Sequence, residues 1–247
     1  MKPLNLHPHE VRAALASTLG MIVRPVKPQP QEYAGGCYPP DRKPKHPAPY
    51  IDAYCGEKKT PANPRGMGRV WCWWTEDDRM GPVIGRCPLG QPGDELWGRE
   101  TWAYFGGDEY LYQQIRDNVA YRSDDLGFDD PVGGRWRPSI QMPRWASRFA
   151  FTIKAVRFER VQDISEADAI AEGVEPNWIG DLNPPGGMAW DAKEHGWNPY
   201  DGDESQEGFP AVTAKDSFQG LFDMLNGPGS WDSNPWVWVY HVERIGE

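Results

Sequence analysis

The sequence predicts an α+β protein, built as a small mixed β-barrel with peripheral helices and long loop insertions. Short segments rich in aromatic and β-branched residues, which favour strands, outnumber the segments with helical spacing. No G-x-G-x-x-G or G-x-x-x-x-G-K-[ST] element is present, which disfavours a dinucleotide-binding fold and a P-loop enzyme. The 247 residues fit a single domain over 1–247 better than two full domains.

Three segments are predicted to be helical. Residues 10–19 place apolar side chains at helical spacing, and a glycine follows them as a stop. Ser165 and Asp168 form a capping box, in which each residue satisfies a free backbone N–H group at a helix start. Thr213 and Asp216 have the same spacing and begin a third helix.

Five segments are predicted to be strands. Aromatic content and alternation of apolar and polar residues place them at 69–74, after the turn Pro92-Gly93-Asp94, at 118–123, at 148–162 and at 234–245. The segment 148–162 is long enough to need a bend or a bulge. Two insertions separate these elements. Residues 28–69 are rich in Pro, Gly and Lys and are expected to be a surface loop, and residues 175–212 are acidic.

Charge is unevenly distributed along the chain. The net charge is −10, but residues 1–75 carry 11 Lys+Arg and 5 Asp+Glu, a balance of +6, and residues 76–247 carry 15 and 31, a balance of −16. Non-specific affinity for nucleic acid comes from neutralising phosphates, so any such binding would need a local basic face. Ordinary solvated surface is the other interpretation.

Several classes of protein are disfavoured. The longest apolar runs are shorter than a membrane span, and the N-terminus has no signal-peptide pattern, so a cytoplasmic location and no membrane partner are predicted. The four cysteines form no C-x-x-C pair and the histidines form no H-E-x-x-H motif, so no metal site and no cofactor are predicted.

Four blocks of sequence resemble one family. "PGDELWGRETWA", "WRPSIQMPRWASR", "VQDISEADAIAEGV" and "NPWVWVYHVERI" resemble bacteriophage and prophage proteins of the ASCH branch of the PUA-like barrels, sometimes labelled phage morphogenetic proteins. The resemblance implies a PUA-like ASCH barrel that binds RNA, DNA or a modified nucleoside in the cytoplasm of a bacterial host. Some small ASCH proteins are amidohydrolases that remove the acetyl group from N4-acetylcytidine. Their site resembles a Lys-x-x-Thr pair after the first helix, with a Glu from a later helix.

The resemblance implies that this catalytic site is degenerate. The segment "VRAALASTLGMIVRPVKPQP" aligns without a gap to a typical relative's "VRAILDGRKTQTRRVIKPQP". Leu19 stands where the lysine would be, Ile22 where the threonine would be, and Glu172 at the carboxylate position. Neither leucine nor isoleucine can take a proton or attack a carbonyl. An active amidohydrolase that uses Glu172 with Ser17 or Thr18 as substitutes is the alternative, and a solvated surface acid is the other interpretation of Glu172.

Arginines and tryptophans form the candidate binding residues. Arg99 and Glu100 are interpreted either as a phosphate-contacting arginine with an orienting acid, or as an ion pair across the barrel. Arg144, Trp145 and Arg148, with Trp136 and Arg137 just before them, have the side chains that stack on bases and contact phosphates. The other interpretation is core tryptophans with arginines whose stems pack along them.

Arg24 matches the relatives' segment, and we expect it to face one cleft at the barrel mouth together with Arg99 and Glu172. A third hypothesis for the whole protein is an interaction module, in which the acidic insertion at 175–212 contacts a host or phage protein.

Overall fold

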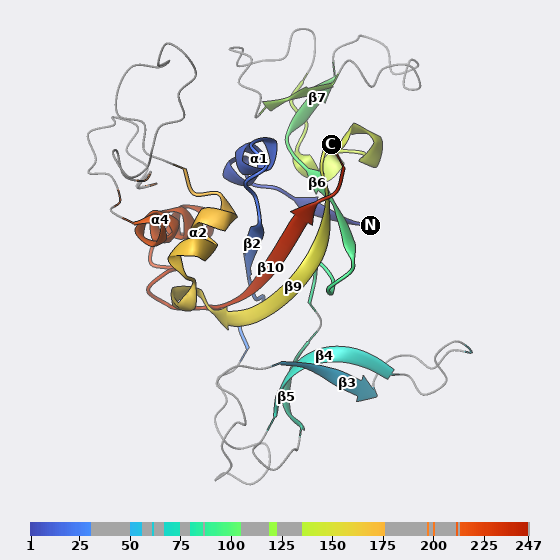
Figure 1. The fold of residues 1–247 in the computed structure, drawn as a ribbon, viewed down its shortest axis with the longest axis vertical. Helices are drawn as coiled ribbons and strands as arrows, with labels where there is room; N and C mark the ends of the chain where they lie inside the picture. The colour runs from blue at the N-terminus through green and yellow to red at the C-terminus, as the bar shows by residue number, and fades with distance from the viewer. Residues whose placement is uncertain are drawn as a thin grey trace.

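The computed structural model describes residues 1–30, 50–55, 61, 67–74, 80–85, 87–104, 119–122, 135–175, 197, 200, 211 and 213–246. Within these ranges the protein is α+β, as predicted (Figure 1). The helices are α1 (Pro8–Leu15), α2 (Glu166–Glu172) and α4 (Ala214–Asn226). The main sheet has five strands, which are β1 (Lys2–Asn5), β2 (Met21–Pro25), β6 (Glu95–Arg99), β9 (Ala150–Arg160) and β10 (Trp236–Arg244).

The main sheet is mixed and is not closed into a barrel. Its strand order is β1-β6-β9-β10-β2, so β1 and β2 are its two edges and are not paired with each other by backbone hydrogen bonds. β1 pairs with β6 in parallel, and the other neighbours are antiparallel. In Figure 1 the sheet curves, with α1 on one side and α2 and α4 on the other.

Both faces of the sheet are covered by apolar side chains. Ile22 on β2 and Tyr240 on β10 pack on the face that receives α1, in one cluster with Val11 and Ala14. Their neighbours along the same strands point to the other face, because successive side chains in a strand alternate. That second face is covered by α4, whose Phe218, Leu221 and Phe222 pack in one cluster with Met21, Val23, Val237 and Val239.

The local signals for the helices are confirmed, but both boundaries of the first helix differ from the prediction. α2 has the capping box of Ser165 and Asp168, and Thr213 caps α4. α1 begins earlier than expected, at Pro8, because the fixed φ of proline suits the first helical position. It also ends earlier, because Ser17 adopts a left-handed conformation with φ 58°, before Gly20 is reached.

The strand predictions are also confirmed. β4 (Met67–Trp74), β6, β8 (Val119–Tyr121), β9 and β10 lie where they were predicted. The pairing of β9 with β10 shifts register between His241 and Val242, which leaves Lys154 of β9 as the extra residue of the expected bulge. β7 (Trp102–Tyr104) pairs with β8. β1 was not predicted, because a four-residue strand has too few positions to show an alternating pattern.

The expected loop at 28–69 is partly wrong. It contains β3 (Tyr50–Cys55), which pairs with β4, and β4 pairs with β5 (Met80–Gly85) in a separate three-stranded sheet (Figure 1). Pairing with β4 decides the conformation of β3, and its own proline-rich surroundings did not indicate a strand. Most of the acidic insertion at 175–212 lies outside the described residues. Among the helices that are described, none has both the length and the apolar character needed to cross a membrane.

Candidate functional site

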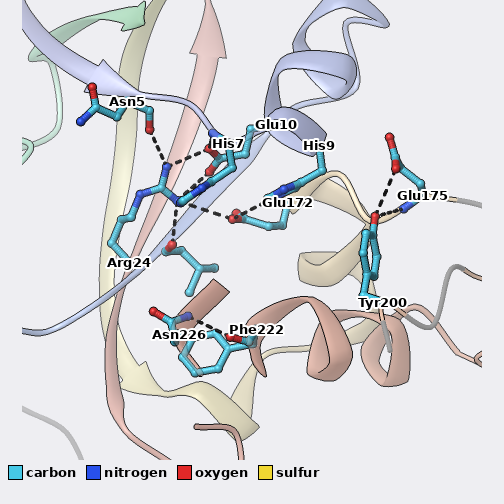
Figure 2. Close-up of polar contacts among 11 residues, drawn as sticks. Asn5, His7, His9, Glu10, Arg24, Glu172, Glu175, Tyr200, Phe222 and Asn226 are labelled. Atoms are coloured by element: carbon cyan, nitrogen blue, oxygen red, sulfur yellow. Dashed lines mark hydrogen bonds and ion pairs between the residues drawn. The ribbon is translucent and has the colours of Figure 1, made fainter. Parts of the chain in front are cut away.

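A buried ion pair between Arg24 and Glu10 lies where α1 meets the edge of the sheet (Figure 2). Arg24 Nη1 and Nη2 donate to the two carboxylate oxygens of Glu10, at 2.6 and 2.8 Å. Nη2 also donates to the backbone carbonyl of Asn5 on β1, at 3.0 Å. Glu10 in turn accepts the backbone N–H of His7 at 2.6 Å, as the acid of the capping box that begins α1. One guanidinium therefore joins both edge strands and the first helix.

Glu172, the last residue of α2, points toward this ion pair. Its carboxylate lies 3.9 Å from Arg24 Nη1 and 3.9 Å from His9 Nε2, and the residue is only 2% exposed. The interpretation of Glu172 as a solvated surface acid is therefore wrong. Gly173, with φ 95°, makes the approach possible, because a Cβ there would lie 2.6 Å from Ala13 of α1. The backbone N–H of Gly20 fixes the same end of α2 by donating to Ala171.

The two buried carboxylic acids hold different charge states. Burial raises the pKa of Glu172 well above its ordinary value, and the charge of Glu10 raises it further. Burial also opposes ionisation of Glu10, but the charge and hydrogen bonds of Arg24 outweigh it and lower the pKa of Glu10. Burial lowers the pKa of His9 from 6.5 to about 4. The Arg24–Glu10 ion pair therefore lies beside a Glu172 whose protonated form is favoured by its surroundings and a His9 whose neutral form is favoured.

Within the described ranges, His9, Glu10 and Glu172 form a group that could ligate a metal ion. One ligand atom from each lies within 4.8 Å of the others, and all three residues are buried. His9 Nε2 and Glu172 Oε2 have no hydrogen-bond partner among the described residues. However, both Glu10 oxygens are already bonded to Arg24, whose positive charge lies beside Glu172. A second cation there would meet like-charge repulsion, so the geometry favours a proton over a metal ion between His9 and Glu172.

Leu19 and Ile22 lie in the apolar core, in the cluster on the α1 face of the sheet. Ile22 is fully buried, and Leu19 lines a cavity of about 540 Å³ together with Ser17. The hydroxyl of Thr18 donates to the carbonyl of Ala13 at the end of α1. No hydrogen bond in the described part of the chain joins Ser17 or Thr18 to Glu172, so these residues do not form a nucleophile–base pair with that acid.

Arg99 and Glu100 do not form the ion pair considered above. Both oxygens of Glu100 accept from Arg148, at 2.8 and 2.9 Å, and Arg148 also lies over the ring of Tyr121 at 3.9 Å. Arg99 donates to the carbonyl of Ile140 at 3.2 Å. In the described ranges no ion pair or hydrogen bond connects Arg99 with Arg24 or Glu172. The structure thus brings Arg24 and Glu172 together but gives Arg99 different contacts.

Arg144 and Trp145 lie on the surface, in the short 3₁₀ helix η5 (Arg144–Ala146). Arg144 is exposed and, with Trp145 and Arg148, lines a cavity of about 310 Å³. Trp145 is half-buried and meets the ring of Trp102 edge-on at 6.1 Å. Arg137, also exposed, lies over the other member of that pair, Trp102, at 5.4 Å. We call Arg137, Arg144 and Trp145 the arginine–tryptophan surface.

Sequence reasoning missed His9 and Glu10. The spacing of His7 and Glu10 matches a helix-capping pair, and the acid serves that purpose in the structure. A cap residue is expected to be at the surface, so the capping signal could have located Glu10 at a helix start but not in a buried cluster. Only the packing of α1 against β2 brings Arg24 to it.

Comparison with protein-family models, with curated proteins and with solved structures found no match. The ASCH resemblance therefore depends on the sequence blocks quoted above.

We predict that Arg24→Met will lower the free energy of unfolding by about 3–5 kcal/mol, because it leaves the charge of Glu10 buried without a partner. The double variant Glu10→Leu/Arg24→Met should lose much less than the sum of the two single variants, because no uncompensated charge remains. Urea denaturation of the three variants measures this. A double variant whose loss equals that sum would contradict a direct coupling between the two residues.

The low pKa of His9 predicts a stability change in mild acid. The pKa is about 4 in the folded state and 6.5 in the unfolded chain, so between these values the unfolded chain binds more protons. Stability that depends on neutral His9 is complete above pH 6.5 and is lost as the pH falls toward 4. At about 1.4 kcal/mol per pH unit, the loss reaches roughly 3 kcal/mol. We expect His9→Gln to remove this loss of unfolding free energy between pH 6.5 and 4, as measured by urea denaturation across that pH range. The control variant His241→Gln, at a half-buried histidine, should retain the loss.

Proposed function

We propose that this protein binds nucleic acid or a modified nucleobase, and that it is an ASCH-type PUA-like protein of phage origin with a degenerate amidohydrolase site. The observation that carries the binding proposal is the arginine–tryptophan surface. Arg144 is exposed and its guanidinium has no hydrogen bond or ion pair in the described part of the chain, so it is available to a phosphate. The aromatic ring of Trp145 lines the same cavity and offers a surface for a base.

The four sequence blocks and the mixed α+β architecture support the assignment to the ASCH group. A curved sheet with helices on its outside is compatible with a PUA-like fold, although the edges β1 and β2 are joined through Arg24 instead of a backbone ladder.

The buried site supports a degenerate hydrolase over an active one. An amide-cleaving site needs a nucleophile with a base beside it and a route for the substrate. Leu19 and Ile22 supply neither group, and Glu172 is 2% exposed among Arg24, Glu10 and His9. We infer that these polar residues now hold α1, α2 and the sheet edge together.

We predict that the purified protein does not deacetylate N4-acetylcytidine at a useful rate. Loss of both nucleophile and base costs many orders of magnitude in turnover. The measurement is chromatographic detection of cytidine after prolonged incubation, with Glu172→Gln as the matched variant. Turnover near one per second that Glu172→Gln abolishes would establish the active hydrolase instead.

The binding proposal predicts a salt-sensitive interaction that depends on the arginine–tryptophan surface. Arg137→Ala/Arg144→Ala should weaken binding of a fluorescent 20-nucleotide RNA or DNA strand at least tenfold at about 50 mM salt. The slope of log affinity against log salt should also fall by about 1.4, since each phosphate contact contributes roughly 0.7 for single strands. Fluorescence anisotropy across a salt series measures both.

Lys2→Ala/Lys154→Ala removes the same charge from other exposed positions, so it is the matched control and should bind as the wild type does. If the wild-type protein binds no strand or duplex at that salt, the nucleic-acid proposal fails. Binding of a host or phage protein then becomes the alternative to test.

A further inference from the structure

A third cavity, of about 270 Å³, is lined in part by Pro8, Val11 and Arg12 of α1. Five parts of the chain converge at this cavity. They are the end of β1, the first turns of α1, the β6–β7 junction, the end of β8 and the 3₁₀ helix η4 (Ser139–Gln141). Figure 1 shows α1, β6 and β7 close together in this part of the molecule. Nothing in the buried Arg24–Glu10 site uses this cavity, so its chemistry can be considered separately.

This cavity is lined by both apolar and polar side chains. Leu6 and Val11 are buried apolar residues. The hydroxyls of Thr101 and Ser139 line it as well, and neither has a hydrogen-bond partner in the described ranges. The exposed Arg122 adds a guanidinium that likewise has no ion pair there. The cavity thus offers an apolar surface, two free hydroxyls and one positive charge that no described acid neutralises.

The other two charged groups at the cavity are already paired. Glu100 is bonded through both oxygens to Arg148, and Arg12 is bonded to Glu175. A bound anion therefore meets no unpaired carboxylate from these residues, and Arg122 decides the sign of the local charge. This arrangement favours a ligand with one negative group.

Hydrogen bonds hold the walls of the cavity in place. The backbones of Trp102 and Arg137 are bonded to each other in both directions, at 2.8 and 3.2 Å. Arg99 holds η4 through the carbonyl of Ile140, and the N–H of Arg122 donates to the carbonyl of Thr101 at 3.1 Å. A site that is formed before binding spends little free energy on ordering its walls.

We propose that this cavity binds one nucleotide, with the base on Leu6 and Val11, its polar edge at Thr101 and Ser139, and the phosphate at Arg122. Its volume lies just below the roughly 300–1,000 Å³ typical of ligand pockets, which suits one base and excludes a stacked pair. The inference rests on the proposed function, because Ser139 lies between Arg137 and Arg144 in the chain. A single strand held by those arginines would place one unstacked base in the cavity.

The first experiment uses mononucleotides as probes. Calorimetric titration with CMP, UMP, AMP and GMP should show binding of at least one at a single site, with a Kd below about 1 mM. The matching nucleoside should bind at least tenfold more weakly, because it lacks the phosphate. Inorganic phosphate should do the same, because it lacks the base. Two results would overturn the proposal. One is inorganic phosphate that binds as tightly as every mononucleotide. The other is no mononucleotide binding at 10 mM, a concentration about tenfold above the expected Kd limit.

Two variants assign the binding to this cavity. Ser139→Phe fills it and Arg122→Gln removes its free charge, and each should weaken mononucleotide binding at least tenfold. Lys154→Gln, a charge removal on β9 outside the cavity, is the matched control and should bind as the wild type does. Circular dichroism establishes that each variant folds. Arg122 is exposed, so its variant keeps the test decisive if Ser139→Phe does not fold. Wild-type affinity in the folded variants overturns the proposal.

Strand binding separates this inference from the proposed function. In one outcome, Arg137→Ala/Arg144→Ala weakens binding of the 20-nucleotide strand, but Ser139→Phe and Arg122→Gln bind both the strand and the mononucleotide as the wild type does. The proposed function then stands, and the proposal of a nucleotide cavity is wrong. If mononucleotides bind and the two cavity variants abolish this, while no strand binds, the cavity stands and the strand-binding function fails.

Discussion

The bidentate ion pair between Arg24 and Glu10 is the interaction on which the arrangement of α1 and both sheet edges depends. A five-stranded sheet has two edges whose backbone groups lack partners, and here these edges are β1 and β2. Arg24 leaves β2, bonds to Glu10 on α1 and reaches the carbonyl of Asn5 on β1. A side chain therefore connects two edges that no backbone ladder joins.

This ion pair also affects the chemistry of Glu172. Burial is the main reason that the pKa of Glu172 is raised, and the nearby charge of Glu10 raises it further. Gly173 brings α2 close enough to α1 for this contact. Together with the apolar Leu19 and Ile22, the cluster connects α1, α2 and the sheet edge.

Five of the described arginines form two groups with different consequences for function. Arg24 and Arg148 are bonded to the buried acids Glu10 and Glu100, so their replacement should cost stability. Arg122, Arg137 and Arg144 are exposed. Arg137 and Arg144 belong to the arginine–tryptophan surface, and Arg122 lines the nucleotide cavity proposed above. An acidic chain with a net charge of −10 can contact phosphate only through such a local group.

Features set by neighbouring residues could be predicted from the sequence. The capping box at Ser165 and the alternation that forms β9 depend on side chains a few positions apart, and both are observed. Glu172 was selected from the sequence through the family resemblance, but its burial and its proton were not predictable. Both properties of Glu172 depend on two long-range contacts. Arg24 binds Glu10, 14 positions away in the chain, and α2 packs against α1, which lies in the opposite part of the chain. Arg148 likewise finds Glu100 across 48 positions, which no local pattern indicates. Folding brings such partners together through burial of the apolar faces around them, so their pairing is a property of the packed chain.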